Sequence, residues 1–190
     1  ANSSLAQELG IPENWIRSQQ AIDTFSGNKI LSGSTPIAMV YAGHQFGHFV
    51  PQLGDGRALL LGECIDKLGN HRDIQLKGSG KTNYSRSGDG RSPIGPVIRE
   101  YLVSEAMHAL NIPTTRALAA VSTGDTVYRD TSFPGGILTR VAKSHVRIGT
   151  FEYFASLNDF ESVQTLSDYC INRLYPDCLN STDKYLTFLK

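Results

Sequence analysis

The sequence predicts an α+β fold in which an antiparallel sheet carries one long helix and is followed by further helices. Three patterns support this prediction. Short apolar segments bounded by glycine turns indicate strands between residues 54 and 142. An apolar periodic segment at 94–110 indicates a helix, and the aromatic-rich segment after residue 144 has the spacing of two more. The 190 residues, of which 40% are hydrophobic, suffice for one well-buried core.

We expect three parts along the chain. Residues 1–36 contain a short helical pattern and a turn-rich run, so they form an N-terminal flank that packs on the core. Residues 37–143 hold the sheet and its helix, and residues 144–190 begin a helical lobe that is incomplete. Gly43 and Gly47 interrupt the apolar segment 37–50, which favours a compact loop or short turn over a long helix.

The best-defined pair of strands follows a glycine turn at Gly54-Asp55-Gly56. An apolar strand of about eight residues comes first, Gly69-Asn70 marks a turn, and residues 73–77 alternate with period two. The pair predicts an antiparallel hairpin. Ile74 and Leu76 share the face expected to meet the core, so Lys77 points to a polar cleft on the other face.

A second hairpin is predicted further along the chain. Thr123-Gly124-Asp125 is expected to be the turn between strands at 114–121 and 126–130. Residues 136–142 supply a further strand, in which Arg140 shares a face with Leu138 and Ala142.

The helix at 94–110 has Pro96 in its first turn and ends before Pro113. Its expected apolar stripe consists of Ile94, Ile98, Tyr101, Leu102 and Ala109. Glu100 lies on the opposite side, but its helical neighbours there are apolar. A partly buried carboxylate needs a cation, and Lys77 is the nearest candidate.

The stretch Asp73 to Glu100 concentrates glycine and positive charge. Eleven of the 18 glycines fall between Gly43 and Gly95, which leaves the backbone free for close approach. Five basic side chains and two acidic ones lie between Lys77 and Glu100. This combination suits a bound phosphate chain. The spacing within Gly78-Ser-Gly-Lys-Thr82 does not fit a Walker A motif, which requires four residues between its glycines.

Composition excludes several other classes. The formal charge is zero, so nothing global indicates nucleic acid or an anionic membrane as a partner. Cys64, Cys170 and Cys178 form no CxxC pair, which suits free thiols in a reducing cytoplasm. No apolar segment reaches the roughly 20 residues of a membrane span. His44 and His48 have metal-ligand spacing only on a helix, so a structural role is favoured.

A strand lysine and a helix glutamate 23 residues apart, preceded by a glycine turn, are parts of a protein-kinase small lobe. A purely structural Lys77–Glu100 salt bridge is the alternative. The turn has only Gly54 and Gly56 where a kinase has GxGxxG, and HRD and DFG motifs are absent, which disfavours an ordinary kinase. Arg140 and Arg147 could hold an anion or be solvated surface residues.

Ordered blocks across residues 37–155 resemble the selenoprotein O family. They are Tyr41–Gly47, Gln52–Arg57, Gln75–Gly78, Tyr84–Arg86, Gly88–Arg91, Ile98–Tyr101, Ser104–Met107, Ile112–Leu118, Leu138–Ala142 and Arg147–Glu152. The resemblance implies a protein-kinase-like fold that binds ATP in a flipped pose. It also implies transfer of AMP, rather than phosphate, to serine, threonine or tyrosine hydroxyls of proteins.

The resemblance also implies roles for single residues. Gly54, Gly56 and Arg57 would form the nucleotide loop, and Lys77 would contact phosphates with Glu100 as its partner. The remaining implied nucleotide contacts are Asp89, Gly90, Arg140 and Arg147. The catalytic aspartate and the ligands of Mg²⁺ or Mn²⁺ are expected after Lys190, so this chain would be part of a longer protein and inactive alone. A nucleotide-binding pseudokinase scaffold and a polyanion-binding module remain as alternatives.

Overall fold

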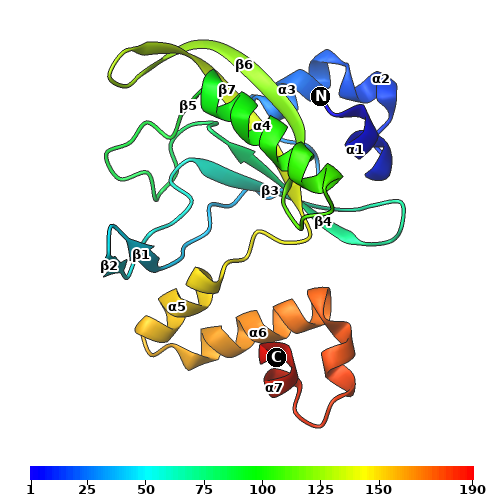
Figure 1. The fold of residues 1–190 in the computed structure, drawn as a ribbon, viewed down its shortest axis with the longest axis vertical. Coiled ribbons are helices and arrows are strands. Elements are labelled where there is room, and N and C mark those ends of the chain that lie inside the picture. Colours follow the sequence, from blue (N-terminus) through cyan, green and yellow to red (C-terminus); the bar gives the residue numbers. More distant parts are fainter. The chain divides into compact units, whose positions relative to one another are not determined.

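The computed structural model describes residues 1–190, which form two compact units (Figure 1). The sheet unit comprises Ala1–Met39 and Gly54–His145, and the helical unit comprises Val40–Leu53 and Val146–Lys190. The predicted α+β class with antiparallel strands is confirmed. Residues 1–36 fold with the sheet, and residues 40–53 with the C-terminal helices, a grouping that the strand and helix patterns did not reveal.

The main sheet has five strands, and every pair in it is antiparallel. The strands are β3 (Ala58–Ile65), β4 (His71–Lys77), β5 (Ser92–Pro93), β6 (Arg116–Tyr128) and β7 (Ser132–Ala142). β3 pairs with β4, which confirms the first predicted hairpin, and β7 pairs with β4, β5 and β6. β4 and β5 both pair with β7. The chain therefore leaves the sheet after β4, at Gly78, and re-enters it at Ser92 as β5, alongside β7.

The second predicted hairpin turn is wrong. Thr123-Gly124-Asp125 lies inside the single strand β6, where the pairing with β7 shifts register between Ser122 and Thr126. Gly124 has a φ of +75°, so the chain takes up the extra residues in a bulge without ending the ladder. The turn comes later, where the Arg129 N–H donates to the Thr131 carbonyl at 2.9 Å.

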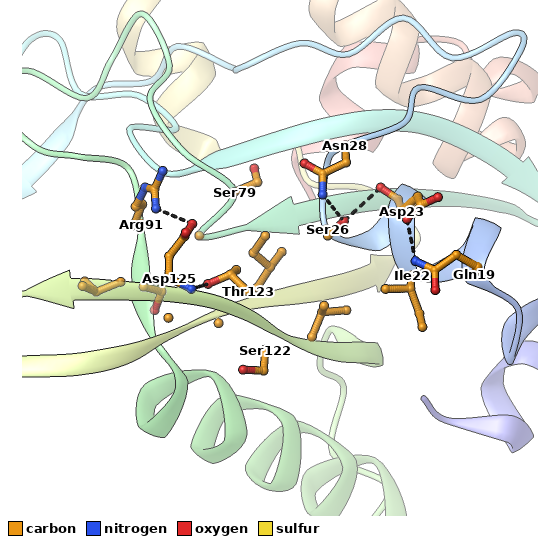
Figure 2. Close-up of a pocket in the computed structure, with 17 residues that line it drawn as sticks. Gln19, Ile22, Asp23, Ser26, Asn28, Ser79, Arg91, Ser122, Thr123 and Asp125 are labelled. Atoms are coloured by element: carbon orange, nitrogen blue, oxygen red, sulfur yellow. Dashed lines mark hydrogen bonds and ion pairs between the residues drawn. The ribbon is translucent and has the colours of Figure 1, made fainter.

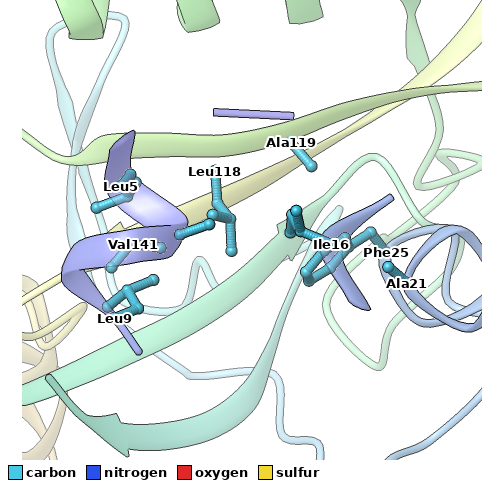
Figure 3. Packing of buried hydrophobic residues seen from close by; sticks show 9 residues of the cluster. Leu5, Leu9, Ile16, Ala21, Phe25, Leu118, Ala119 and Val141 are labelled. Carbon is cyan, nitrogen blue, oxygen red and sulfur yellow. The ribbon is translucent and has the colours of Figure 1, made fainter. Parts of the chain in front are cut away.

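Three short helices cover one face of the sheet: α1 (Ser3–Glu8), α2 (Glu13–Ile16) and α3 (Gln19–Phe25). Their apolar side chains pack with Leu118 of β6 and Val141 of β7, as Figure 3 shows. Leu118 has 0% of its surface exposed. The side chains of Asn2 and Ser18 cap α1 and α3 by accepting bonds from helix N–H groups. The prediction that the N-terminal flank packs on the core is confirmed.

The helix α4 (Ile94–Ala109) packs on the opposite face, through Val97 against Ala117 of β6 and Leu138 of β7. The expected apolar stripe is partly wrong, because Ile98 and Leu102 are 43% and 61% exposed. The buried positions are Val97 and Ser104, with Ile94 and Tyr101 partly buried. The face that packs on the sheet keeps Ile94 and Tyr101 of the expected stripe but is rotated toward Val97 and Ser104.

The helical unit contains a small hairpin and four helical segments. The hairpin consists of β1 (Gly43–Gln45) and β2 (His48–Val50), where a loop or short turn was expected. The helical segments are α5 (Ile148–Ser156), α6 (Phe160–Leu174), the 3₁₀ helix η1 (Pro176–Asn180) and α7 (Lys184–Leu189). The two helices predicted after residue 144 are confirmed as α5 and α6.

Two general properties follow from the coordinates. None of the helices combines the length and apolar character needed to cross a bilayer. All three cysteines are free, and burial raises the pKa of the Cys64 and Cys170 thiols, which keeps them in the unreactive protonated form.

Candidate functional site

The face of β4 that meets α4 is polar and buried. Asp73, Gln75 and Lys77 alternate along it, and Gln75 is 0% exposed. The opposite face carries Ile74 and Leu76 toward the N-terminal helices. Polar side chains in such a position must be paired to offset their lost hydration. This face of β4 therefore carries polar and charged side chains that must be paired, and they are the candidates for a functional site.

The Lys77–Glu100 pair predicted from the sequence is confirmed as an ion pair. The Lys77 Nζ atom lies 2.6 Å from Oε2 of Glu100, and 24% and 31% of the two side chains are exposed. β4 ends at Lys77, and Glu100 lies in the second turn of α4, so sheet and helix together fix the distance. The role of the pair at a nucleotide stays a prediction.

Arg140 joins the same carboxylate from β7. It stands directly opposite Gln75 in the pairing of β4 with β7. Its Nη1 atom lies 3.4 Å from Oε1 of Glu100, and its Nη2 atom donates to the side-chain oxygen of Gln75. Only 12% of the Arg140 side chain is exposed. Two cations thus share one carboxylate. We call Lys77, Glu100 and Arg140 the cationic cluster.

The electrostatics of the cationic cluster favour an anion. Burial lowers the pKa of Lys77, and the hydrogen bond that Lys77 donates to Glu100 opposes this effect. The charges of Arg140 and Arg57 lower the pKa further. Arg57 is exposed, and its carbonyl accepts the N–H of Gly78 at 2.7 Å. Lys77 and Arg140 therefore share the carboxylate of Glu100, and the carboxylate of Asp55 lies across the Gln75 amide from Arg140. A bound anion would interact favourably with these cations.

The loop residues Thr82, Tyr84 and Ser85 pack directly against the glycine turn at residues 54–56. A side chain at Gly54 would meet the ring of Tyr84 at 2.3 Å, and one at Gly56 would meet the Tyr84 carbonyl at 2.7 Å. Hydroxyl groups of the loop bind the turn as well: Thr82 donates to the Asp55 carbonyl at 2.7 Å, and Ser85 to that of Gly56 at 2.5 Å. The close approach inferred from these glycines is therefore an approach of Tyr84, and a nucleotide contact stays a prediction.

Asp89 and Gly90 lie at the neck of the loop formed by residues 78–91. The Gly90 carbonyl accepts the Gly80 N–H at 3.1 Å, and a side chain at Gly90 would lie 1.9 Å from the Gly80 carbonyl oxygen. The carboxylate of Asp89 binds both terminal nitrogens of Arg129 at 2.9 Å, which holds its pKa at about 2. The structure thus ties Asp89 to the β6–β7 turn instead of to the cationic cluster.

Arg147 belongs to the helical unit, at the start of α5. Its guanidinium stacks over the ring of Tyr41 at 4.7 Å. The backbone at this point is fixed by Ala42, whose N–H donates to the Gly149 carbonyl at 2.7 Å. These contacts join the segment 40–53 to α5. The expectation that Arg147 acts with Arg140 on one ligand stays a prediction.

The sheet unit contains a cavity of about 280 Å³, lined by α3 and the residues after it, the loop neck, the bulge of β6 and part of β7. Figure 2 shows the residues that line it. Its most polar feature is an ion pair of Arg91 with Asp125, 2.5 Å between Nη1 and Oδ2. Sequence reasoning gave neither residue a role, and nothing in their spacing signals this pairing. The cavity lies beside the loop neck, since Ser79 and Arg91 also form the bridge that closes the loop.

Metal ligands are a separate question. No three His, Cys, Asp or Glu side chains of residues 1–190 come together as a metal site. His44 and His48 lie on two strands of a hairpin, where helical ligand spacing does not apply. The expected position of the metal ligands after Lys190 stays a prediction.

Fold and site together define an α+β domain with a partly buried cationic cluster suited to a polyanion. Comparison with known proteins gives the family. The profile of the family described as "Protein adenylyltransferase SelO" matches residues 1–190, so the chain belongs to this family.

Several curated relatives carry the name "Protein nucleotidyltransferase YdiU". The relative from Nitrobacter winogradskyi is 60% identical over 187 residues, and that from Alkalilimnicola ehrlichii is 59% identical over 189 residues. A third, from Maridesulfovibrio salexigens, is 60% identical over 188 residues. These matches cover 98%, 100% and 99% of this chain but only 37%, 38% and 38% of the relatives. The chain thus spans well under half of their length.

Proposed function

We propose that this chain is the ATP-binding part of a protein adenylyltransferase, which transfers AMP from ATP to serine, threonine or tyrosine hydroxyls of proteins. The observation that carries the proposal is the cationic cluster, in which Lys77 and Arg140 share the carboxylate of Glu100. Family membership and the printed names of the relatives support nucleotidyl transfer as the reaction class. In this proposal the sheet unit is the small lobe of a kinase-like fold.

The role of the cluster in this proposal is to neutralise the phosphate chain. Lys77 and Arg140 are desolvated cations, and fixed charges in such surroundings stabilise an anion more strongly than they do in water. Arg57 adds an exposed positive charge beside Lys77. Gly54, Gly56, Asp89, Gly90 and Arg147 are the further proposed nucleotide contacts.

The proposed reaction needs groups beyond this cluster. The hydroxyl oxygen of the protein substrate bonds to the α-phosphorus, the bond from that phosphorus to its bridging oxygen breaks, and pyrophosphate leaves. The hydroxyl proton goes to a base, for which the family resemblance implies an aspartate after Lys190. A divalent ion, Mg²⁺ or Mn²⁺, would take its ligands from the same region and would neutralise phosphate charge. The residues described here would bind and orient the nucleotide.

A nucleotide-binding scaffold without catalysis is the second candidate. It shares the cationic cluster with the first candidate, because Glu100 is paired with two cations and is unsuited to act as a base in either case. A scaffold would bind ATP through the same cluster and transfer nothing.

The decisive experiment uses the full-length protein with ATP labelled at either the α- or the γ-phosphate. We expect the α-label alone to appear on protein, and Lys77→Ala to reduce it at least about 100-fold because a fixed cation at the phosphates is lost. Lys143→Ala, which removes an exposed lysine after β7, is the control and should label like the wild type.

Each other outcome has a defined meaning. Transfer of the γ-label would mark a kinase, and ATP binding without either label would support the scaffold. Undiminished labelling by Lys77→Ala would refute the assignment of Lys77.

A further inference from the structure

Gln75 is the most deeply buried polar residue beside the cationic cluster. It lies in the middle of β4, between its partner strands β3 and β7, and is 0% exposed. A primary amide in this position must pair both its oxygen and its nitrogen to offset lost hydration. Its partners therefore say what the residue does.

Both ends of the Gln75 amide meet a charged side chain. The oxygen accepts from Nη2 of Arg140, and the nitrogen donates to Oδ2 of Asp55 at 3.3 Å. Reversing the amide would set its N–H groups against the guanidinium and its oxygen against the carboxylate. One orientation is therefore strongly favoured, and it presents an acceptor to Arg140.

Asp55 connects this amide to the glycine turn. It stands between Gly54 and Gly56, it is 3% exposed, and its carboxylate also accepts the N–H of Met39 at 3.4 Å. Its own N–H donates to the Met39 carbonyl at 2.9 Å, so the backbone around the carboxylate is fixed. A continuous series of contacts thus runs from the glycine turn through Gln75 and Arg140 to Glu100.

The acceptor on Gln75 determines how the carboxylate of Glu100 is shared. Nη2 donates to Gln75, Nη1 lies 3.4 Å from Glu100, and Lys77 has the closer contact with Glu100, at 2.6 Å. Without that acceptor, the guanidinium is freer to turn toward both oxygens of Glu100, since a bidentate pair is its preferred arrangement with a carboxylate. It would then compete with Lys77.

We infer that Gln75 is a positioning residue that holds Arg140 in place for a phosphate group and keeps Lys77 on Glu100. This inference rests on the proposed function, because it assumes that the cluster binds ATP. The inference adds Gln75 to the site. It predicts that Gln75 affects ATP affinity through Arg140, so that its substitution has little effect on the affinity once Arg140 is absent.

The test is a double-mutant cycle on ATP affinity in the full-length protein, measured by calorimetry with Mg²⁺ present. Gln75→Met should weaken ATP binding about tenfold, the value of one hydrogen bond to a charged group. In an Arg140→Met background the same substitution should change the affinity less than about twofold, since the group it positions is gone.

A matched control separates positioning from folding. Thr139→Val changes a residue that is also 0% exposed and adjacent to Arg140, but on the opposite face of β7. It should leave ATP affinity unchanged. A melting temperature is recorded for every variant, because a purely structural role of Gln75 would lower it without weakening ATP binding at temperatures where the protein is folded.

The outcomes are distinguishable. If the wild type does not bind ATP, the proposed function fails, and the inference with it. If the wild type binds ATP but the two substitutions add independently, only the role of Gln75 is refuted. Should Gln75→Met fail to fold, the cycle is repeated with Gln75→Asn, whose shorter side chain withdraws the acceptor from Arg140 but keeps a polar amide. The same criterion holds: coupling with Arg140→Met supports the inference, and additivity overturns it.

Discussion

Two glutamates of α4 are both paired with arginine, but their surroundings differ. Glu105 accepts from Arg116 at 2.9 Å, from the N–H of Ala117 at 2.9 Å and from the side chain of Asn2 at 2.7 Å. Glu100 meets two cations, Lys77 and Arg140. The first carboxylate is satisfied mostly by one cation and neutral donors, whereas the second is shared by two cations. Pairing alone therefore does not distinguish the two carboxylates, but the number of cations on each one does.

The Glu105 site is structural in this comparison. Its donors come from the N-terminal flank and from β6, so it fastens α4 to both. Only 22% of the Glu105 side chain and 13% of the Arg116 side chain are exposed. Substitution at Glu105 should therefore reduce stability, while substitution at Glu100 should chiefly change how the protein responds to anions.

The largest expected effect is that of Glu105→Gln. It should lower the free energy of unfolding by about 3 kcal/mol, because a mostly buried Arg116 loses its close charged partner and keeps only the 3.4 Å contact with the exposed Glu8. The measurement is urea denaturation followed by the fluorescence of Trp15, the single tryptophan, which packs on the same core. Glu13→Gln is the control: its pair with Arg17 is 73% and 69% exposed, so the change should stay below about 0.5 kcal/mol. An equal loss in both variants would contradict the comparison.

The second prediction concerns the pH dependence of the same contact. Burial alone would raise the pKa of Glu105, but the bonds from Arg116 and Ala117 outweigh it, so the pKa is lowered in the folded state. The stabilisation is then present above the unfolded pKa of about 4.3 and is lost as the pH falls through the folded value.

The measurement compares the wild type with Glu105→Gln. The difference in their urea midpoints should be constant from pH 7 to about pH 5 and should shrink at lower pH as the wild type protonates Glu105. A difference that stays the same down to pH 3 would show that the carboxylate charge is not what holds Arg116.

The Lys77–Glu100 pair shows how far sequence reasoning reaches. The pairing was predictable because a partly buried carboxylate needs a cation and the strand supplies one. Part of the argument was wrong, since Val103 beside Glu100 is 52% exposed, and Glu100 is buried instead by packing onto β4 and β7. The role of Gln75 was not predictable, because it depends on the register that sets Gln75 opposite Arg140.

The glycines mark a second limit. Their positions were a correct signal of close approach, but the sequence cannot say which atoms approach. Gly54 accommodates the ring of Tyr84, and Gly90 accommodates the carbonyl of Gly80. Likewise Gly124 was interpreted as a turn, although a glycine with positive φ serves equally well in a bulge. Local patterns identify such positions, and only the tertiary contacts decide between the possible structures.

Glu100→Gln should cost less stability than Glu105→Gln, and it gives the sharpest contrast with Glu105. The free energy of unfolding should fall by about 1 kcal/mol. The substitution removes an attraction to two cations, but the Lys77 and Glu100 side chains are 24% and 31% exposed, so restored hydration offsets part of the loss.

Sulfate should then stabilise Glu100→Gln more than it stabilises the wild type, since the anion no longer competes with a carboxylate for Lys77 and Arg140. Glu105→Gln should respond to sulfate like the wild type. The measurement is the shift of the urea midpoint on adding sodium sulfate, compared with sodium chloride at equal ionic strength. Equal sulfate responses in all three proteins would mean that the two cations at Glu100 do not attract the anion, and the distinction between the two glutamates would fall.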